Sequence, residues 1–365
     1  MNFDGVRNAK AEVFADAFRF QEILSVQGAD NTGPTFGPMS GTEVYEDIAA
    51  ARRQRKVDPR EMIAVGVLRP DGHNANPDEL QLGIFIQHNK LRQHPVVERA
   101  ARIARGEVRV IFTGPARRRA VLNGGRYRPL TIGASVGHRR ITAGTLGCFC
   151  RSRQGGGIGF LSNNHVLANN NRARPGDIIL QPGRADGGQH GNAADGVAAL
   201  YQFVALDFSP GAVNRVDCAF AYLLADVGCD PDRFSDPHDA KRVWPIGAID
   251  DLLLEQDFVH KVGRTTGYTK GSVTAVEVDN LVVQMAFGSG AKLARFDGQI
   301  AIEGREGHFS KGGDSGSIIF TKDGRPAALL FAGTETRSRG TYGITYANPI
   351  GLVLEQLDLD IYTGR

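Results

Sequence analysis

The feature that most constrains the fold is a series of short apolar runs, separated by glycines, that fills the chain after residue 141. These runs are rich in β-branched and aromatic residues: TLGCFCR, IGFLSNN, VAALYQFVAL, DCAFAYLL, FVHKVGR, GSVTAVEV, NLVVQMAF, GQIAIEG, GSIIFTK, PAALLFAG and TYGITYA. Many short strands with regular turns are typical of all-β sandwiches and barrels. This number of runs suits two barrels better than one sandwich. We therefore predict a mainly β fold, a double β-barrel, for residues 141–365.

The N-terminal region has a different pattern. Apolar residues recur at helical spacing in residues 8–24 and 42–56, which predicts two helices joined by a loop at 27–41. The next segments predict the order strand, strand, helix, strand, at 61–68, 80–87, 94–105 and 107–114. Such an order indicates a small α+β layer with the helix on one face of the sheet.

The predicted organisation has four parts and a short terminal helix. The parts are a helical segment (1–57), a small α+β unit (58–115), a linker (116–140) and the β-barrel domain (141–365). The stretch NPIGLVLEQLDL near the end of the chain has helical spacing and follows the last β-rich run. Nothing in the α+β unit gathers nucleophiles, metal ligands or a phosphate-binding loop, so its role cannot be read from its residues.

The compartment expected from the sequence is the cytoplasm. No run approaches the roughly 18 apolar residues of a membrane helix, and the first residues lack the apolar core of a signal peptide. A bond between Cys148 and Cys150 would be strained, because neighbours two apart on a strand rarely reach disulfide geometry. Cys218 and Cys229 have no zinc-ligand spacing. We expect four reduced thiols, no metal and no cofactor.

The charge pattern leaves one alternative partner class open. Basic residues cluster at 51–56 (ARRQRK) and 116–119 (ARRR) in a chain of net charge +3. The clusters lack the interleaved aromatics of nucleic-acid readers, so a solvated helix face or loop is the favoured interpretation. A nucleic-acid-associated protein is the weaker hypothesis, and no membrane partner is expected.

Two segments supply groups that acyl transfer to water requires. That chemistry needs a nucleophile, a base, a group that orients the base, and donors for the developing oxyanion. FLSNNHVLAN places His165 where an apolar strand ends, although a structural histidine would also fit there. NRVDCAFAYL places Asp217 at the start of an apolar strand, where an aspartate capping a turn is the alternative.

The segment SKGGDSGSIIF is the most specific of the three. Its glycines allow a tight turn that exposes Ser315 and points the amides of Gly313 and Ser315 into one concavity. Two such amides can stabilise an oxyanion. A plain glycine-rich turn is the alternative, but the apolar strand that follows immediately makes it a poorer interpretation.

Together the three segments resemble the chymotrypsin-like serine proteases. FLSNNHVL is similar to the histidine segment of that family, VDCAFAYL to its aspartate strand and GGDSGS to its nucleophile turn, in the family's order. The pieces GTLG, ILQPG and KVGRTTG further resemble an intracellular branch, the plant narrow-leaf serine proteases and their bacterial relatives. The resemblance covers about residues 141–355 and implies a serine endopeptidase acting on an intracellular protein.

The resemblance also implies a role for each residue. Ser315 would be the nucleophile, His165 the general base and then acid, and Asp217 the group that orients the imidazole. Gly313 and Ser315 would supply the oxyanion amides. PAALLFAG is similar to the strand that aligns the substrate backbone, which implies that Gly333 lies beside the cleft.

Three departures from the family pattern affect specificity and activation. Ser317 stands where most secreted members have glycine. Phe309 stands where tryptic members have an acidic pocket floor, which argues against Lys/Arg specificity and for an apolar or small P1 residue. Secreted members often become active when a freed amino terminus pairs with the aspartate before the nucleophile. No activation site is evident here, so Asp314 needs another partner or none.

Two function classes follow. The leading hypothesis is an endopeptidase restrained through its N-terminal region, which is a candidate site for a regulatory partner. The alternative is a catalytically silent protease-fold scaffold that binds protein partners.

Overall fold

The computed structural model describes residues 1–18, 59–68, 80–113, 122–235, 244, 248, 253, 258–287, 290–334 and 343–364. The predicted loop at 27–41, the predicted helix at 42–56 and the basic clusters at 51–56 and 116–119 lie outside the described residues. The chain divides into two compact units, each built from three segments. Unit 1 comprises Met1–Pro115, Asp207–Arg215 and Thr274–Ala301, and unit 2 comprises Ala116–Leu206, Val216–Val273 and Ile302–Arg365.

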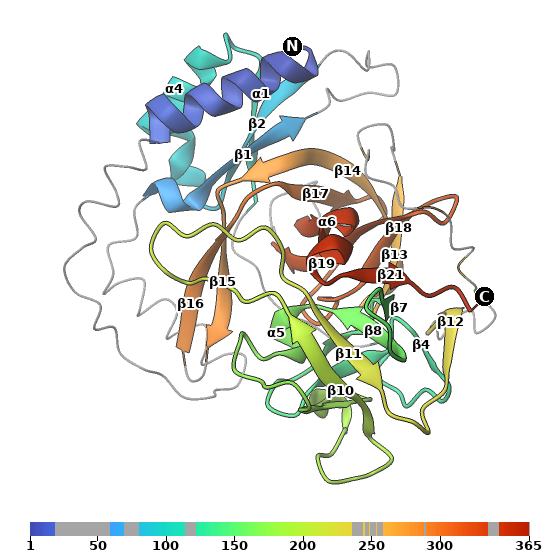
Figure 1. The fold of residues 1–365 in the computed structure, drawn as a ribbon. Helices are drawn as coiled ribbons and strands as arrows, with labels where there is room; N and C mark the ends of the chain where they lie inside the picture. Colours follow the sequence, from blue (N-terminus) through green and yellow to red (C-terminus); the bar gives the residue numbers. More distant parts are fainter. Residues whose placement is uncertain are drawn as a thin grey trace. The chain divides into compact units, whose positions relative to one another are not determined.

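Unit 1 contains the α+β layer expected from the sequence (Figure 1). Its helices are α1 (Phe3–Glu12), η1 (Val13–Phe18), η2 (Pro59–Met62), η3 (Asn89–Gln93) and α4 (Pro95–Ile103). Its strands are β1 (Ile63–Leu68), β2 (Gln81–Ile86), β3 (Val108–Phe112) and the hairpin β15 (Leu281–Phe287) and β16 (Gly290–Phe296). The order β1, β2, α4, β3 is the predicted one. The helix predicted from residue 8 begins earlier, at Phe3, because Asn2 caps it by accepting the amide of Gly5 at 2.8 Å.

A buried lysine holds α1 within unit 1. The Nζ of Lys10 donates to the carbonyl of Glu277 at 2.7 Å and pairs with Asp279 at 2.9 Å. Both acceptors lie on β14 (Gly267–Asp279), whose end pairs with β1. Arg7 forms an ion pair with Glu277 and lowers the pKa of that carboxyl. The helix is therefore fastened to the sheet by charges as well as by its apolar side chains.

The first half of unit 2 is a curled half-barrel. Its sheet has the order β21-β7-β8-β11-β10-β9-β5-β6. The strands are β5 (Ser135–His138), β6 (Gly144–Thr145), β7 (Cys148–Ser152), β8 (Ile158–Ser162), β9 (Ile178–Leu180), β10 (Gly196–Phe203), β11 (Ala219–Leu223) and β21 (Leu359–Ile361). Two short helices, α5 (Asn164–Leu167) and η4 (Arg184–Asp186), lie in its connections. The sheet packs around a core rich in Phe, Leu, Val and Ala side chains.

A closed six-stranded barrel follows. Its order is β13-β18-β19-β20-β17-β14, and pairing between β13 and β14 closes it. The remaining strands are β13 (Val259–Gly263), β17 (Gln299–Gly304), β18 (Ile318–Thr321), β19 (Pro326–Gly333) and β20 (Ile344–Pro349). The terminal helix α6 (Ile350–Gln356) packs on β19 and β20 (Figure 1). The mainly β double barrel preceded by a small α+β region, as predicted from the sequence, is confirmed, with one barrel closed and the other a curled half-barrel.

The predicted linker at 116–140 needs a correction. Its later part contains β4 (Leu130–Ile132) and β5, both fully buried. β5 pairs with β9, and β4 runs parallel to β12 (Cys229–Phe234). These residues therefore belong to the half-barrel side of unit 2. The strands were missed because each is only a few residues long and lies among arginines and glycines, which hide its apolar pattern.

All four cysteines are free thiols, and the Sγ atoms of Cys148 and Cys150 lie 3.8 Å apart. Burial raises the pKa of the Cys150 and Cys218 thiols, so both stay protonated and unreactive. Within the described ranges, no group of three or more His, Cys, Asp or Glu side chains is arranged to hold a metal ion. The helices of the described residues include none that is long and apolar enough to cross a membrane.

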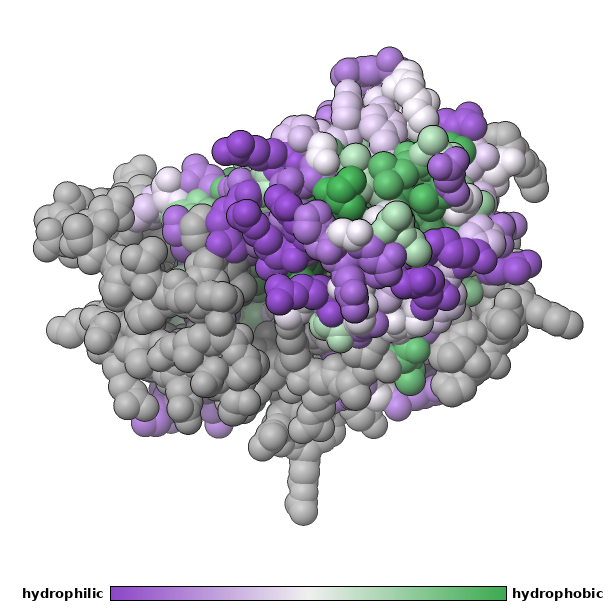
Figure 2. Space-filling model, turned by 90° about the horizontal axis from the view of Figure 1, so that it is seen from below, coloured by the Kyte–Doolittle hydropathy of each residue, from purple (hydrophilic) through white to green (hydrophobic). Residues whose placement is uncertain are grey.

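Apolar side chains also reach the surface. Figure 2 shows a group of green, hydrophobic residues among purple, hydrophilic ones on the face seen from below. Among the described residues, Leu122, Tyr201 and Val213 are the large apolar side chains that are most exposed. The Tyr201 ring lies against that of Tyr222 with centroids 4.6 Å apart and planes tilted by 56°, so its exposed ring is supported by the strand β11 beside it.

Candidate active site

His165 and Asp217 form a direct pair at the edge of the half-barrel. Strand β8 ends at Ser162, and α5 then carries His165, whose Nδ1 lies 2.5 Å from Asp217 Oδ2. The amide of His165 donates to Asp217 Oδ1 at 3.2 Å. The Asp217 side chain is fully buried, whereas that of His165 is 22% exposed. A carboxylate on Nδ1 fixes the imidazole tautomer and leaves Nε2 as the atom able to accept a proton.

Neutral amide side chains hold Asp217 from both sides. Its backbone amide donates to Asn348 Oδ1 at 3.0 Å, and its carbonyl accepts from Asn163 Nδ2 at 2.7 Å. Asn348 comes from β20 of the closed barrel and is fully buried. Neither asparagine was predicted from the sequence to belong to the site. The available signal was a polar residue inside the apolar run ITYANP, which a buried strand retains only when it is hydrogen-bonded.

Asparagines also shape the turn that follows α5. Asn169, Asn170 and Asn171 all have positive φ, at 51°, 53° and 68°. Asparagine adopts this left-handed conformation more readily than most residues. Asn171 accepts from Leu206 and exchanges hydrogen bonds with Asn164, the residue before His165. The helix that presents the imidazole is therefore fixed at both ends.

The nucleophile turn lies between β17 and β18. Gly313 and Gly316 have φ of +99° and +94°, which is the conformational freedom that the sequence analysis expected of these glycines. The Ser315 hydroxyl donates to the carbonyl of Phe331 on β19 at 3.4 Å. In the described part of the chain, the amides of Gly313 and Ser315 donate no hydrogen bond, whereas the amide of Asp314 between them donates to Lys311 at 3.0 Å. These two amides are therefore open to a further acceptor.

The turn and the histidine segment meet through Thr145. The Thr145 amide donates to the carbonyl of Ser315 at 2.8 Å, and the Thr145 carbonyl accepts from Ser162 Oγ at 2.7 Å. Close approach also requires Gly144, since a Cβ there would lie 2.4 Å from Val166 Cγ2 and 3.0 Å from the Ser315 carbonyl oxygen. The backbone of Ser315 therefore packs beside the residue that follows His165. Among the hydrogen bonds of the described residues, none joins the Ser315 hydroxyl to the imidazole.

The two predicted substrate-binding residues lie in different surroundings. Gly333 ends β19 opposite Thr345, and a Cβ on it would meet Ser310 Oγ at 3.3 Å. The ring of Phe309 is only 1% exposed and lies near Lys261 Nζ, so it belongs to the interior rather than to the floor of an open pocket. The sequence offset gave the position of Phe309 along the turn, but it could not give the direction of the side chain.

The comparisons with known proteins concern the fold. No protein-family model matches the chain, and no curated protein matches it in sequence. Protease A of Thermobifida fusca is 16% identical, with a TM-score of 0.42 over 64% of this chain and 98% of that one. Chymotrypsin of Cellulomonas bogoriensis is 18% identical, with a TM-score of 0.41 over 65% of this chain and 100% of the other.

A third similar structure is a glutamic acid-specific serine protease described as using a histidine triad in substrate binding. It is 16% identical, with a TM-score of 0.44 over 64% of this chain and 100% of that one. All three neighbours are serine proteases. At these identities the chemistry of the present site has to be judged from its own atoms.

Proposed function

We propose that the chain is a serine endopeptidase that cleaves peptide bonds through an acyl-enzyme intermediate. In this proposal Ser315 is the nucleophile, His165 the general base and then acid, and Asp217 the orienting carboxylate. The observation that carries it is the buried Asp217 carboxylate bonded to Nδ1 of a partly exposed His165. Catalytic pairs of this kind need such a geometry, whereas a structural histidine does not.

The proposed mechanism uses each group in turn. Ser315 Oγ attacks the scissile carbonyl carbon while its proton passes to His165 Nε2, and Asp217 stabilises the imidazolium that forms. The amides of Gly313 and Ser315 bind the oxyanion. The imidazolium then protonates the leaving amine, and the acyl ester remains on Ser315. Water, deprotonated by the same imidazole, hydrolyses the ester and restores the hydroxyl.

The reaction requires one side-chain rotation. The Ser315 hydroxyl donates to Phe331, and in this proposal it rotates about χ1 and donates to His165 Nε2 instead. Catalytic hydrogen bonds are often long or misdirected before substrate binds, so this resting orientation is compatible with catalysis. A substrate backbone that pairs with β19 would compete for the Phe331 carbonyl and release the hydroxyl.

A fluorophosphonate probe tests the proposal on the full-length chain. We expect wild-type protein to be labelled at Ser315, as mapped by peptide mass spectrometry, and Ser315→Ala to be unlabelled. Ser317→Ala is the matched control, because Ser317 lies two residues away with its hydroxyl bonded to the Asp314 carbonyl at 2.6 Å. Folded wild-type protein that neither labels nor cleaves denatured protein substrates would contradict the proposal.

A second candidate function is a catalytically silent scaffold that binds protein partners. The observation that favours it is the orientation of the Ser315 hydroxyl. A scaffold would retain the resting Ser315–Phe331 bond in every state. It would bind peptides with the same affinity in wild-type and Ser315→Ala proteins and would convert none of them. An intracellular protein substrate is also part of our proposal, because four unpaired thiols fit a reducing compartment.

A further inference from the structure

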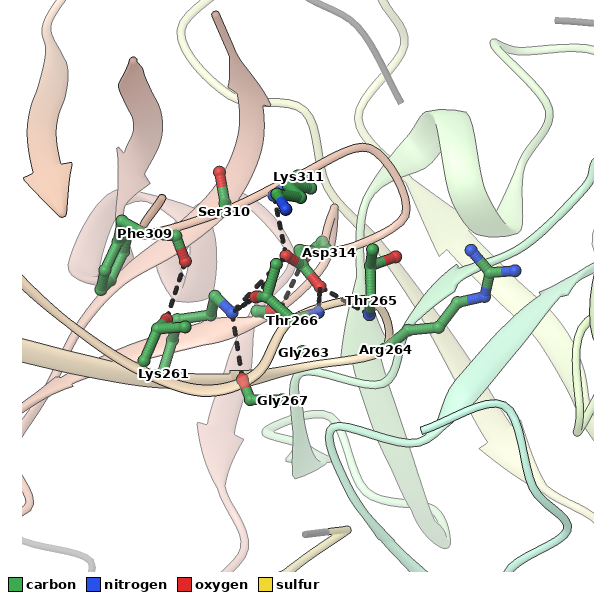
Figure 3. A network of polar contacts seen from close by, with 12 residues as sticks. Lys261, Gly263, Arg264, Thr265, Thr266, Gly267, Phe309, Ser310, Lys311 and Asp314 are labelled. Atoms are coloured by element: carbon green, nitrogen blue, oxygen red, sulfur yellow. Dashed lines mark hydrogen bonds and ion pairs between the residues drawn. The ribbon is translucent and has the colours of Figure 1, made fainter. Parts of the chain in front are cut away.

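Asp314, the residue before the proposed nucleophile, is fully buried and saturated with hydrogen bonds (Figure 3). Its Oδ1 accepts the amides of Thr265 and Thr266 at 2.7 and 3.1 Å. Its Oδ2 accepts the Thr266 hydroxyl at 2.7 Å and the Lys311 amide at 2.9 Å. Burying a carboxylate is costly unless a cation lies close by.

That cation is Lys261 of β13, whose side chain is also fully buried. Its Nζ lies 3.5 Å from Asp314 Oδ2, donates to the Thr266 hydroxyl and donates to the carbonyl of Gly267 at 3.1 Å. The three ammonium protons thus have three partners. Arg264, another cation in this loop, does not compete for Asp314, because its guanidinium binds Asp186 at 2.5 and 2.7 Å.

The same loop fixes the turn that carries the oxyanion amides. The hydroxyl of Thr265 donates to the carbonyl of Gly312 at 2.8 Å, and that of Thr145 donates to the carbonyl of Gly313 at 2.9 Å. The Gly312 carbonyl belongs to the same peptide group as the Gly313 amide, and the Asp314 carbonyl, which accepts from Ser317 Oγ at 2.6 Å, belongs to that of the Ser315 amide. Because both carbonyls are engaged and the Asp314 side chain is anchored, neither peptide group can rotate freely. Their orientation leaves the amides of Gly313 and Ser315 without partners in the described part of the chain.

The geometry points to Lys261 as a positioning residue that assembles the oxyanion site through Asp314 without a newly cut amino terminus. The inference rests on the proposed function. In proteases of the kind that the sequence resembles, a freed amino group pairs with this aspartate. Here the cation beside this aspartate is Lys261, with its Nζ 3.5 Å from Asp314 Oδ2.

Loss of the Lys261 charge should make activity and stability change with pH in opposite directions. Burial lowers the pKa of Lys261, although Asp314 opposes the shift, so the ammonium loses its proton at a lower pH than an exposed lysine. Activity then falls as pH rises through that pKa. By linkage, a lysine with a depressed folded pKa makes the folded state relatively more stable as pH rises toward its unfolded pKa. Loss of activity without loss of stability therefore separates positioning from support of the fold.

Lys261→Met tests the inference in the full-length protein, with Lys10→Met as control. Lys10 is also a buried lysine with carboxylate partners, but it belongs to unit 1. We expect Lys261→Met to lower kcat and the fluorophosphonate labelling rate about 100-fold, as loss of an oxyanion donor does, with KM little changed. Lys10→Met should lose thermal stability and keep kcat. A folded Lys261→Met protein with wild-type labelling would overturn the inference.

Two measurements keep the inference testable if Lys261→Met does not fold. Lys261→Arg keeps its charge to higher pH, so the alkaline limb of kcat should move upward; an unmoved limb contradicts the assignment. Wild-type protein with an acetylated amino terminus should keep its labelling rate, and a large loss would assign the role to that amino group. Absence of labelling in wild-type protein would instead overturn the proposed function, and this inference with it.

Discussion

The two sides of the site are held by different kinds of interaction. On the half-barrel side, neutral asparagine amides hold Asp217, which in turn holds His165. On the closed-barrel side, a buried ion pair between Asp314 and Lys261 anchors the turn that carries Ser315. Amide hydrogen bonds do not titrate, whereas the ion pair depends on a lysine whose pKa is already lowered. The base should therefore keep its position over a wide pH range, and the oxyanion amides should not.

Asp217→Asn gives the largest expected effect and tests the half-barrel side. An amide at this position reverses the favoured tautomer of His165, so kcat should fall about 10⁴-fold while the fold is kept. Asp195→Asn is the control, because Asp195 is equally buried and bonded to Arg126, away from the proposed triad. Steady-state kinetics and near-UV circular dichroism distinguish the outcomes. A loss below tenfold would mean that Asp217 does not orient the base.

Gly313→Ala tests the closed-barrel side and should cost about 100-fold in kcat. A Cβ there would lie 2.4 Å from Arg264 Nη1 and 2.5 Å from Thr265 Oγ1, at a backbone φ of +99°. The turn would have to shift, and the oxyanion amides would shift with it. Gly157→Ala serves as the control, because its φ is ordinary and nothing lies within 4 Å of the added carbon. Equal kcat values for the two variants would show that the turn does not take part in catalysis.

Asn348→Leu should have the smallest effect on activity and shows how much the neutral support contributes. It leaves the buried amide of Asp217 without its acceptor, which costs about 1–3 kcal/mol of stability. We expect kcat to fall about tenfold as the carboxylate drifts. Asn214→Leu is the control: Asn214 accepts the amide of Asp207 at 2.8 Å in unit 1, so it should lose stability alone. Parallel losses of kcat in both variants would show that the effect is global.

The fold and the His–Asp pair could be predicted because their signals are local. Glycine-punctuated apolar runs specify strands, and His165 and Asp217 sit at the ends of such runs. Lys261 could not be found in this way, since KVGRTTG does not reveal that its lysine side chain points inward. The side chain of Phe309 lies near Lys261 in the same interior, so its direction could not be predicted from the sequence either. A polar residue inside an apolar strand, such as Asn348, is the sequence signal that would have revealed more of the residues around the site.

Thr145 restricts how the half-barrel and the closed barrel of unit 2 can move relative to each other. Its amide donates to the Ser315 carbonyl, its hydroxyl donates to the Gly313 carbonyl, and its carbonyl accepts from the Ser162 hydroxyl. Sliding one barrel along the other would break the bonds to Ser315 and Gly313 together, whereas tilting about the threonine would strain them unequally. The junction should therefore deform by tilting at Thr145, and such a tilt would move the turn that carries Ser315 relative to the segment that carries His165.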